Sequence, residues 1–251
     1  MAKIKAPPKV SVVIPAKDEE HNIEILLKRL RKVIGKIKGF KKNDFEIIVV
    51  CDNCKDKTEI KAKKHGVKTI RRTGNPGKSK ALIEGFKTSK GEILVAMDAD
   101  LSHLPEELPK LLKKLSSREK IGLVIASRFA GKSDDTTFIR EIGGRVFNIL
   151  MNILFQTNLT DAINGYKVFE RHIFDNFSFT SEGYAIEIEL IANTLRAKKK
   201  VAEIPSYEAK RMFDQVKSKV IKDGWIFFKE ILSEGWQYNL EKLNKFINHD
   251  R

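Results

Sequence analysis

The sequence predicts an α/β protein in which a mostly parallel central sheet is flanked by helices. Short apolar runs alternate along the chain with longer segments of helical periodicity, which is the pattern of strand–helix–strand crossover units. Acidic residues follow several of the apolar runs, where an open parallel sheet has its ligand crevice. The 251 residues are enough for one large domain, or for one domain with an appendage.

Strand–helix pairs fill the first half of the chain. The apolar run at residues 10–14 ends at Pro15 and predicts a strand. Leucine and isoleucine at helical spacing predict the helix that follows, with Asp18 as a candidate cap. The same alternation continues to Pro105, which suits the first turn of a helix. The predicted strands are residues 10–14, 45–50, 67–70, 92–97 and 121–126, and the predicted helices are 23–34, 58–65, 79–88 and a segment that begins at 104–106.

The pattern changes after Arg128. A polar loop at 130–137 comes before an amphipathic segment that predicts a helix over 138–155. The remaining predicted elements are a strand at 165–169, a helix at 184–196, a strand at 201–206 and a C-terminal helix whose apolar residues are Val220, Trp225, Phe228, Ile231, Leu232 and Trp236. We therefore divide the chain into a main domain, residues 8–213, and a C-terminal amphipathic helical tail, residues 214–251.

Charge and composition indicate a globular protein with a polyanionic partner. The chain carries 48 Lys and Arg against 33 Asp and Glu, a formal charge of +15, which favours nucleic acid, anionic lipid headgroups or a phosphorylated substrate. The basic residues are scattered rather than interleaved with stacking aromatic residues, which argues against a nucleic-acid-binding module. No apolar stretch reaches the length of about eighteen residues that spans a bilayer, so no membrane span is expected.

The two cysteines, Cys51 and Cys54, argue against a disulfide framework and for a reducing compartment. Their C-x-x-C spacing has no second pair, so a buried thiol plus a loop thiol is the plainer interpretation beside a metal or redox role. The first eight residues lack the apolar segment of a signal peptide. We therefore expect a cytoplasmic protein.

The most informative motif is Asp98-Ala99-Asp100, which follows the buried run at 92–97. Two aspartates one residue apart, at the carboxyl end of a strand, can share a divalent cation that neutralises a diphosphate. Glu19 and Asp52 follow the first two predicted strands, where they can hydrogen-bond a base or ribose. A solvated turn or a helix cap is the alternative for each residue alone. Their recurrence at strand ends predicts a nucleotide site.

A glycine-rich loop at 74–79 is similar to a phosphate loop only in composition. A Walker A motif needs four residues between its glycines, and Gly74 and Gly77 are separated by two. No G-x-G-x-x-G motif follows the first strand either. The sequence therefore disfavours P-loop NTPases and dinucleotide-binding proteins.

The order of these motifs resembles the family 2 glycosyltransferases, which have the GT-A fold and use nucleotide-diphosphate sugars. The resemblance covers roughly residues 8–220. The motifs that carry it are Val-Ser-Val-Val-Ile-Pro-Ala-Lys-Asp-Glu-Glu at 10–20, Val-Val-Cys-Asp-Asn at 49–53, Gly-Lys-Ser-Lys-Ala-Leu at 77–82, Met-Asp-Ala-Asp-Leu-Ser-His at 97–103 and Ala-Ser-Arg at 126–128.

Within that family, the second half is similar to the dolichyl- or polyprenyl-phosphate sugar synthases. The motifs are Asp-Ala-Ile-Asn-Gly-Tyr-Lys-Val-Phe at 161–169, Glu-Ile-Glu-Leu at 187–190, Ser-Lys-Val at 218–220 and Asp-Gly-Trp at 223–225. The Glu-Ile-Glu-Leu run looks slightly more like the glucosyl than the mannosyl branch.

The resemblance implies a role for each matching residue. Pro15, Glu19 and Asp52 would hold the base and ribose, and Lys78 would lie beside the base. The Asp98-Ala99-Asp100 motif would bind Mg²⁺ or Mn²⁺ and the diphosphate. Arg128 and Arg140 would lie near the phosphates of donor and acceptor, and Arg211 and Lys219 belong to a segment that closes over the diphosphate in relatives. The sequence departs from the family pattern at Lys17, Cys51, Ser102 and Ala185.

The implied reaction is inverting attack of an acceptor oxygen on the anomeric carbon, with nucleoside diphosphate leaving. A cation and basic side chains spread the charge of the leaving group. A hydroxyl acceptor needs a general base, and the chain has Asn164-Gly165 where such relatives carry an acidic pair. A lipid phosphate is already anionic and needs none. Asp161 is a candidate base, or holds the loop.

We therefore expect a metal-dependent transferase that moves mannose or glucose from GDP-mannose or UDP-glucose to dolichyl or polyprenyl phosphate. A soluble hydroxyl acceptor, on a small molecule, a polysaccharide or a protein, is the alternative. The segments 145–155 and 217–236 mix aromatic residues with basic ones, so they can lie in the headgroup layer with Trp225 and Trp236 at its boundary. Packing on the sheet or a dimer contact is the other interpretation. The expected location is peripheral, on the cytoplasmic membrane face.

Overall fold

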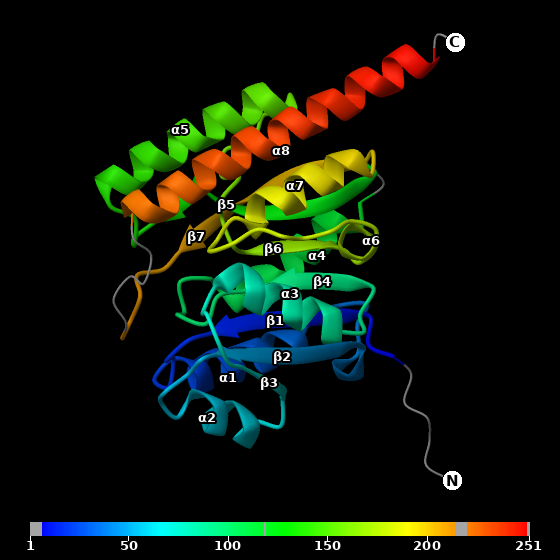
Figure 1. The fold of residues 1–251 in the computed structure, drawn as a ribbon. Coiled ribbons are helices and arrows are strands. Elements are labelled where there is room, and N and C mark those ends of the chain that lie inside the picture. The colour runs from blue at the N-terminus through cyan, green and yellow to red at the C-terminus, as the bar shows by residue number, and fades with distance from the viewer. Residues whose placement is uncertain (1–6, 118, 214–219, 250–251) are drawn as a thin grey trace.

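The computed structural model describes residues 7–117, 119–213 and 220–249. Within them, seven strands form one sheet in the order β3-β2-β1-β4-β6-β5-β7 (Figure 1). The strands are β1 Val10–Ala16, β2 Phe45–Asp52, β3 Lys68–Arg72, β4 Ile93–Ala96, β5 Ile121–Ser133, β6 Lys167–Glu170 and β7 Lys200–Glu208. The helices are α1 Ile23–Ile34, α2 Thr58–Lys64, α3 Lys78–Thr88, α4 Leu108–Leu115, α5 Phe138–Phe155, α6 His172–Asp175, α7 Ile186–Arg196 and α8 Val220–His249, with short 3₁₀ turns at Lys42–Asp44 and Pro105–Glu107.

The sheet is parallel except at one strand. β1 pairs in parallel with β2 and β4, β2 with β3, and β5 with β7. β6 runs antiparallel to both of its neighbours, β4 and β5. Strands buried on both faces form continuous apolar runs, and this is why the runs in the sequence located them. The predicted α/β class with a mostly parallel sheet is confirmed.

Two apolar layers pack against the two faces of the sheet. On one face, α1, α2 and α4 cover side chains such as Val12 and Ile14 of β1. On the other face, α3, α5, α6, α7 and α8 pack on side chains such as Val13 and Ile48. Alternate residues of β1 therefore serve different layers, as the pleat of a strand requires.

Two local expectations were wrong. The predicted loop at 130–137 begins too early, because β5 continues to Ser133 and pairs with β7 again after a register shift, with Lys132 opposite Tyr207. Asp18 does not cap α1. Its backbone has a positive φ of 52°, and its carboxylate accepts a hydrogen bond from the backbone N–H of Lys55 at 2.7 Å.

The helices α5 and α8 lie side by side at one end of the molecule, far from α2 (Figure 1). Gly235 of α8 makes this packing close, because a Cβ there would come within 2.8 Å of Leu154 on α5. In the described residues, no helix is both long enough and apolar enough to cross a bilayer. The proposed division at residue 214 remains a prediction, since 214–219 lie outside the described residues.

Candidate active site

The predicted site residues gather at the edge of the sheet where the parallel strands end. Asp52 is the last residue of β2, and Asp98 and Asp100 follow β4 directly. Arg128 is the first residue of β5 beyond its fully buried part, and Asp161 precedes β6. Because β6 is antiparallel, its beginning points to the same edge as the ends of β4 and β5. One reversed strand thus adds its leading loop to a site otherwise built from strand ends.

The Asp98 carboxylate is held by a basic side chain from α3. The Lys78 Nζ lies 2.7 Å from Asp98 Oδ1 and 2.9 Å from Oδ2. Burial alone would raise the pKa of Asp98, but Lys78 and the ring of His103 outweigh it and lower the pKa to about 2. His103 is fixed by stacking on Tyr166, and its Nδ1 accepts a hydrogen bond from the backbone N–H of Asp98. Asp98 is therefore ionised at neutral pH.

Asp100 is held by a second set of donors. Its Oδ1 accepts hydrogen bonds from the hydroxyl and the backbone N–H of Ser102, at 2.6 and 3.1 Å. Its Oδ2 accepts from Arg211 Nε at 2.6 Å, and the same guanidinium pairs with Asp135. Burial and the neighbouring Asp98 raise the pKa of Asp100, but Arg211 and Ser102 hold it below its ordinary value. Ser102 thus supports Asp100 even though it departs from the family pattern.

The donor set of this pair fits a divalent cation. Both carboxylates are ionised, and carboxylate oxygens are the ligands that Mg²⁺ and Mn²⁺ prefer. Among the described residues, no third acidic, His or Cys side chain joins Asp98 and Asp100 within reach of one ion. The remaining ligands would come from a diphosphate or water. Asp98 and Asp100 would hold such a cation.

Arg128 and Asp161 form a buried ion pair. Asp161 is fully buried, and its two oxygens accept from Arg128 Nε at 2.8 Å and Nη2 at 2.9 Å. The backbone N–H of Arg128 also donates to Asp161, and Glu208 contacts the guanidinium at 3.3 Å. Burial would lower the pKa of Arg128, but Asp161 and Glu208 raise it above its ordinary value. These contacts favour the interpretation of Asp161 as a residue that holds the loop and Arg128.

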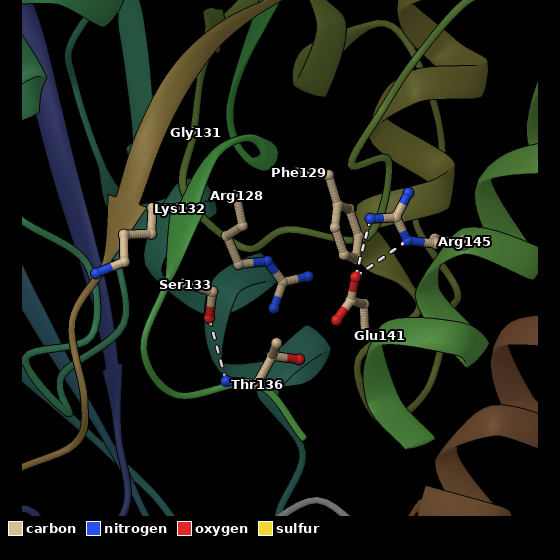
Figure 2. A pocket seen from close by; sticks show the side chains of 8 residues that line it. All are labelled: Arg128, Phe129, Gly131, Lys132, Ser133, Thr136, Glu141 and Arg145. Carbon is tan, nitrogen blue, oxygen red and sulfur yellow. Dashed lines mark hydrogen bonds and ion pairs between the residues drawn. The ribbon is translucent and has the colours of Figure 1, made fainter. Parts of the chain in front are cut away.

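A pocket of about 220 Å³ opens beside this ion pair, between β5 and α5 (Figure 2). The residues that line it are Arg128, Phe129, Gly131, Lys132, Ser133, Thr136, Glu141 and Arg145. Figure 2 shows Arg145 and Arg128 on the two sides of Phe129, and each guanidinium lies within 5.6 Å of its ring centroid. Arg145 is also held by Glu141 at 2.9 Å. The pocket collects positive charge suited to an anion.

The residues predicted to bind base and ribose lie at the ends of β1 and β2. The Asp52 carboxylate accepts a hydrogen bond from the backbone N–H of Gly77 at 2.6 Å and pairs with a basic side chain of β3. The Glu19 side chain is buried and accepts from Asn22 Nδ2 at 2.7 Å. Pro15 lies within β1. Contacts of these residues with a nucleotide remain predictions, and so does contact of a base with the α3 lysine.

Two predicted phosphate-binding residues lie elsewhere or cannot be placed. Arg140 is in the first turn of α5 and is not among the residues that line the pocket. Lys219 lies outside the described residues. Lys132 and Arg145 line the pocket but were not predicted as site residues. The spacing of Glu141 and Arg145, four residues apart on a predicted helix, could have indicated that these two side chains pair.

The strand order, with helices on both faces of the sheet, is that of the GT-A fold. Solved structures of glucosyl-3-phosphoglycerate synthase from Mycobacterium tuberculosis show the same fold. The complex with phosphoglyceric acid has a TM-score of 0.70 at 22% identity and covers 92% of this chain and 81% of that chain. The complex with Mn²⁺, uridine-diphosphate-glucose and phosphoglyceric acid has a TM-score of 0.72 at the same identity and coverage.

The chain belongs to glycosyl transferase family 2, whose family model matches residues 11–177. It is 32% identical to a dolichol-phosphate mannosyltransferase of Pyrococcus furiosus over 78% of this chain and 55% of that protein. It is 29% identical to an undecaprenyl-phosphate mannosyltransferase of Micrococcus luteus over 78% of this chain and 82% of that protein. The match thus spans little more than half of the Pyrococcus protein. The resemblance inferred from the motifs is confirmed.

Proposed function

We propose that this protein is a metal-dependent, inverting glycosyltransferase that moves mannose or glucose from a nucleotide-diphosphate sugar to dolichyl or polyprenyl phosphate. The observation that carries the proposal is the position of the basic pocket, which is lined by Arg128 of β5 and by Arg145 of α5, the helix that also carries exposed apolar side chains. The similarity to a dolichol-phosphate mannosyltransferase and to an undecaprenyl-phosphate mannosyltransferase agrees with it.

At the donor end of the site, the protein supplies carboxylates and a basic side chain. Asp98 and Asp100 would hold Mg²⁺ or Mn²⁺, which when bound would offset the negative charge of the departing nucleoside diphosphate. Arg211, bonded to Asp100 at 2.6 Å, is placed to bind diphosphate oxygens as well. Asp52 and Glu19, at neighbouring strand ends, are the proposed ligands of ribose and base.

At the acceptor end, the protein positions an anion rather than activating a hydroxyl. A phosphate oxygen carries negative charge near neutral pH, so it attacks without a general base. Arg128 and Arg145 supply guanidinium groups on two sides of the pocket, and Arg140, in the first turn of α5, is the further predicted phosphate ligand. Asp161 keeps Arg128 in one orientation through a bidentate pair. Positioning and charge compensation are then the main contributions to catalysis.

The apolar chain of the acceptor has a surface to follow. On α5, the exposed apolar side chains are Phe138, Ile139, Ile142, Val146, Ile149 and Ile153, and on the neighbouring α8 they are Trp225, Phe228, Leu232, Trp236, Leu240, Leu243, Phe246 and Ile247. An apolar surface of this extent is uncommon on a monomer and marks an interaction site. We propose that it lies in the headgroup layer of a membrane, with the pocket at the same level.

A transfer assay tests the proposal. The protein is incubated with labelled GDP-mannose or UDP-glucose and with polyprenyl phosphate or soluble acceptors, in the presence and absence of Mn²⁺. We expect label on the lipid, dependent on the metal, and a loss of about a hundredfold or more in Asp98→Asn. Transfer to soluble hydroxyls alone would reject the lipid acceptor in favour of the alternative. Metal-independent transfer at the wild-type rate in Asp98→Asn would reject the cation site.

A further inference from the structure

Four charged side chains form a row that ends at the first aspartate of the motif. Lys167 Nζ lies 2.8 Å from Glu187 Oε2, Glu187 Oε1 lies 3.5 Å from Lys78 Nζ, and Lys78 Nζ lies 2.7 Å from Asp98 Oδ1. Glu187 and Lys167 are almost completely buried, whereas Asp98 keeps a quarter of its side chain exposed. The row therefore runs from the interior outward to the proposed cation site.

Glu187 has one oxygen with no hydrogen bond. Lys167 already uses its donors on Glu187 Oε2 and on the carbonyl oxygens of Ala162 and Asn164, while Glu187 Oε1 is buried and accepts nothing. A buried carboxylate oxygen that accepts no hydrogen bond destabilises the folded protein, so its presence calls for an explanation. The Lys78 ammonium forms an ion pair with this oxygen at 3.5 Å.

Gly165 leaves just enough room for the lysine. A Cβ at this position would overlap Lys78 Nζ and would lie 3.3 Å from both Asp98 Oδ2 and Glu187 Oε1. The bare backbone of Gly165 thus forms one wall of a space that contains the lysine ammonium and both carboxylates. Within this space the ammonium lies less than 1 Å beyond hydrogen-bond distance of Glu187.

Lys78 also contacts both oxygens of Asp98, the side chain proposed to bind the divalent cation. A cation and an ammonium at the same oxygens repel each other, so the ammonium must withdraw when the cation binds. We propose that Glu187 is a positioning residue that receives the Lys78 ammonium when a divalent cation binds Asp98, and thereby sets the affinity of that site for the cation. This inference rests on the proposed function, because it assumes a cation at Asp98.

The test is Mn²⁺ binding to the full chain, measured from the electron paramagnetic resonance signal of free Mn²⁺, with neither sugar donor nor lipid present. In Glu187→Gln the withdrawn ammonium has a weaker acceptor, and we expect the Kd for Mn²⁺ to rise about tenfold. In Lys78→Met the competing charge is gone, and the Kd should fall. The matched control is Glu107→Gln, a buried glutamate of the Pro105–Glu107 turn that accepts from the Ser206 hydroxyl and from the backbone N–H of Tyr207.

The double variant separates a movement of Lys78 from a general effect of charge. If Glu187 acts through Lys78, then adding Glu187→Gln to Lys78→Met leaves the Kd unchanged. An equal weakening in both backgrounds, or an equal weakening in Glu107→Gln, overturns the inference. If Glu187→Gln does not fold, Lys78→Met alone decides, because binding no tighter than that of the wild type is incompatible with displacement. Unchanged Mn²⁺ binding in Asp98→Asn would instead reject the cation site itself.

Discussion

The role of a residue in this site depends more on the side chains that it contacts than on its own chemical type. Asp161 shows this most clearly, because its carboxylate accepts hydrogen bonds from Arg128 and Asn164. A general base needs an oxygen that can reach the acceptor, whereas a fully buried carboxylate bound to a guanidinium orients that guanidinium. The two roles predict different effects of the same substitution.

Asp161→Asn is therefore expected to lower the stability as well as the activity. Removing the Asp161 charge takes away the bidentate partner of Arg128 and leaves it only the Glu208 carboxylate at 3.3 Å, at a cost of about 3 kcal/mol, measurable by urea unfolding. The turnover number should fall together with the affinity for the phosphate acceptor. Lys63→Met, which removes an exposed side chain paired with Glu59, is the stability control and should change the free energy of unfolding by less than about 1 kcal/mol. A loss of turnover with unchanged stability and acceptor affinity would restore the general-base role.

Asp98 gives a prediction on acid sensitivity. Its pKa is about 2 in the folded protein against an ordinary value of 3.8, so its ionised form favours the folded state. That contribution is complete above the ordinary value and is lost as the pH falls towards the folded value. Unfolding free energies measured between pH 5 and pH 2 should therefore fall less steeply in Asp98→Asn than in the wild type. Parallel curves would contradict the pairing of Asp98 with Lys78.

At the scale of elements, most of the fold could be predicted from the sequence, since apolar runs and helical spacing are local signals. The strand before the aspartate pair and the helix over 138–155 were both located. The end of β5 was missed because its last residues are held by pairing with β7, a strand far along the chain. For the same reason the pocket was not predicted. The proximity of Lys78 to Glu187 is likewise a product of the folded chain, although both residues stand in recognised motifs.

The contact between α7 and α8 contains an acidic cluster that no local pattern reveals. Glu230 of α8 faces Glu189 of α7 and Glu234 of α8, and Glu234 is itself paired with Arg196. Burial, reinforced by the two neighbouring carboxylates, raises the pKa of Glu230 to about 7. The packing of α8 on the rest of the molecule is therefore sensitive to pH.

The sign of this dependence follows from the raised pKa. The folded protein favours the protonated form of Glu230, so its stability falls as the pH rises from 4.5 through about 7. Glu230→Gln removes the effect and should stabilise the protein at pH 8 by about 1 kcal/mol, a value reduced for the partial exposure of the side chain. At pH 5 the variant and the wild type should melt together. A constant difference at both pH values in differential scanning calorimetry would contradict the assignment to titration.

The two ends of the whole molecule, on either side of the sheet, differ in their exposed apolar side chains. The end formed by β3 and α2 carries few exposed apolar side chains, and Ile60 is one of them, 57% exposed. At the other end, α5 and α8 lie side by side in Figure 1. Both helices carry exposed apolar side chains, and α5 also lines the basic pocket. A formal charge of +15 adds a general attraction to anionic bilayers. This asymmetry supports the proposal that the molecule approaches a membrane with the end formed by α5 and α8.

Flotation with anionic vesicles tests this orientation. Ile149→Ser and Trp236→Ser remove exposed side chains from α5 and α8, and each should weaken binding to the vesicles by about tenfold, in line with the transfer energy of one large apolar group. The matched control is Ile60→Ser, a side chain of similar exposure on α2, and it should bind as the wild type does. If the surface instead joins two copies of this chain, the two variants will abolish a dimer seen by analytical ultracentrifugation and leave vesicle binding unchanged. High salt screens the attraction between charges but does not prevent the insertion of apolar side chains. If binding to the vesicles persists in 0.5 M salt in the wild type but is lost in the two variants, the protein binds by insertion and not by attraction of its basic surface.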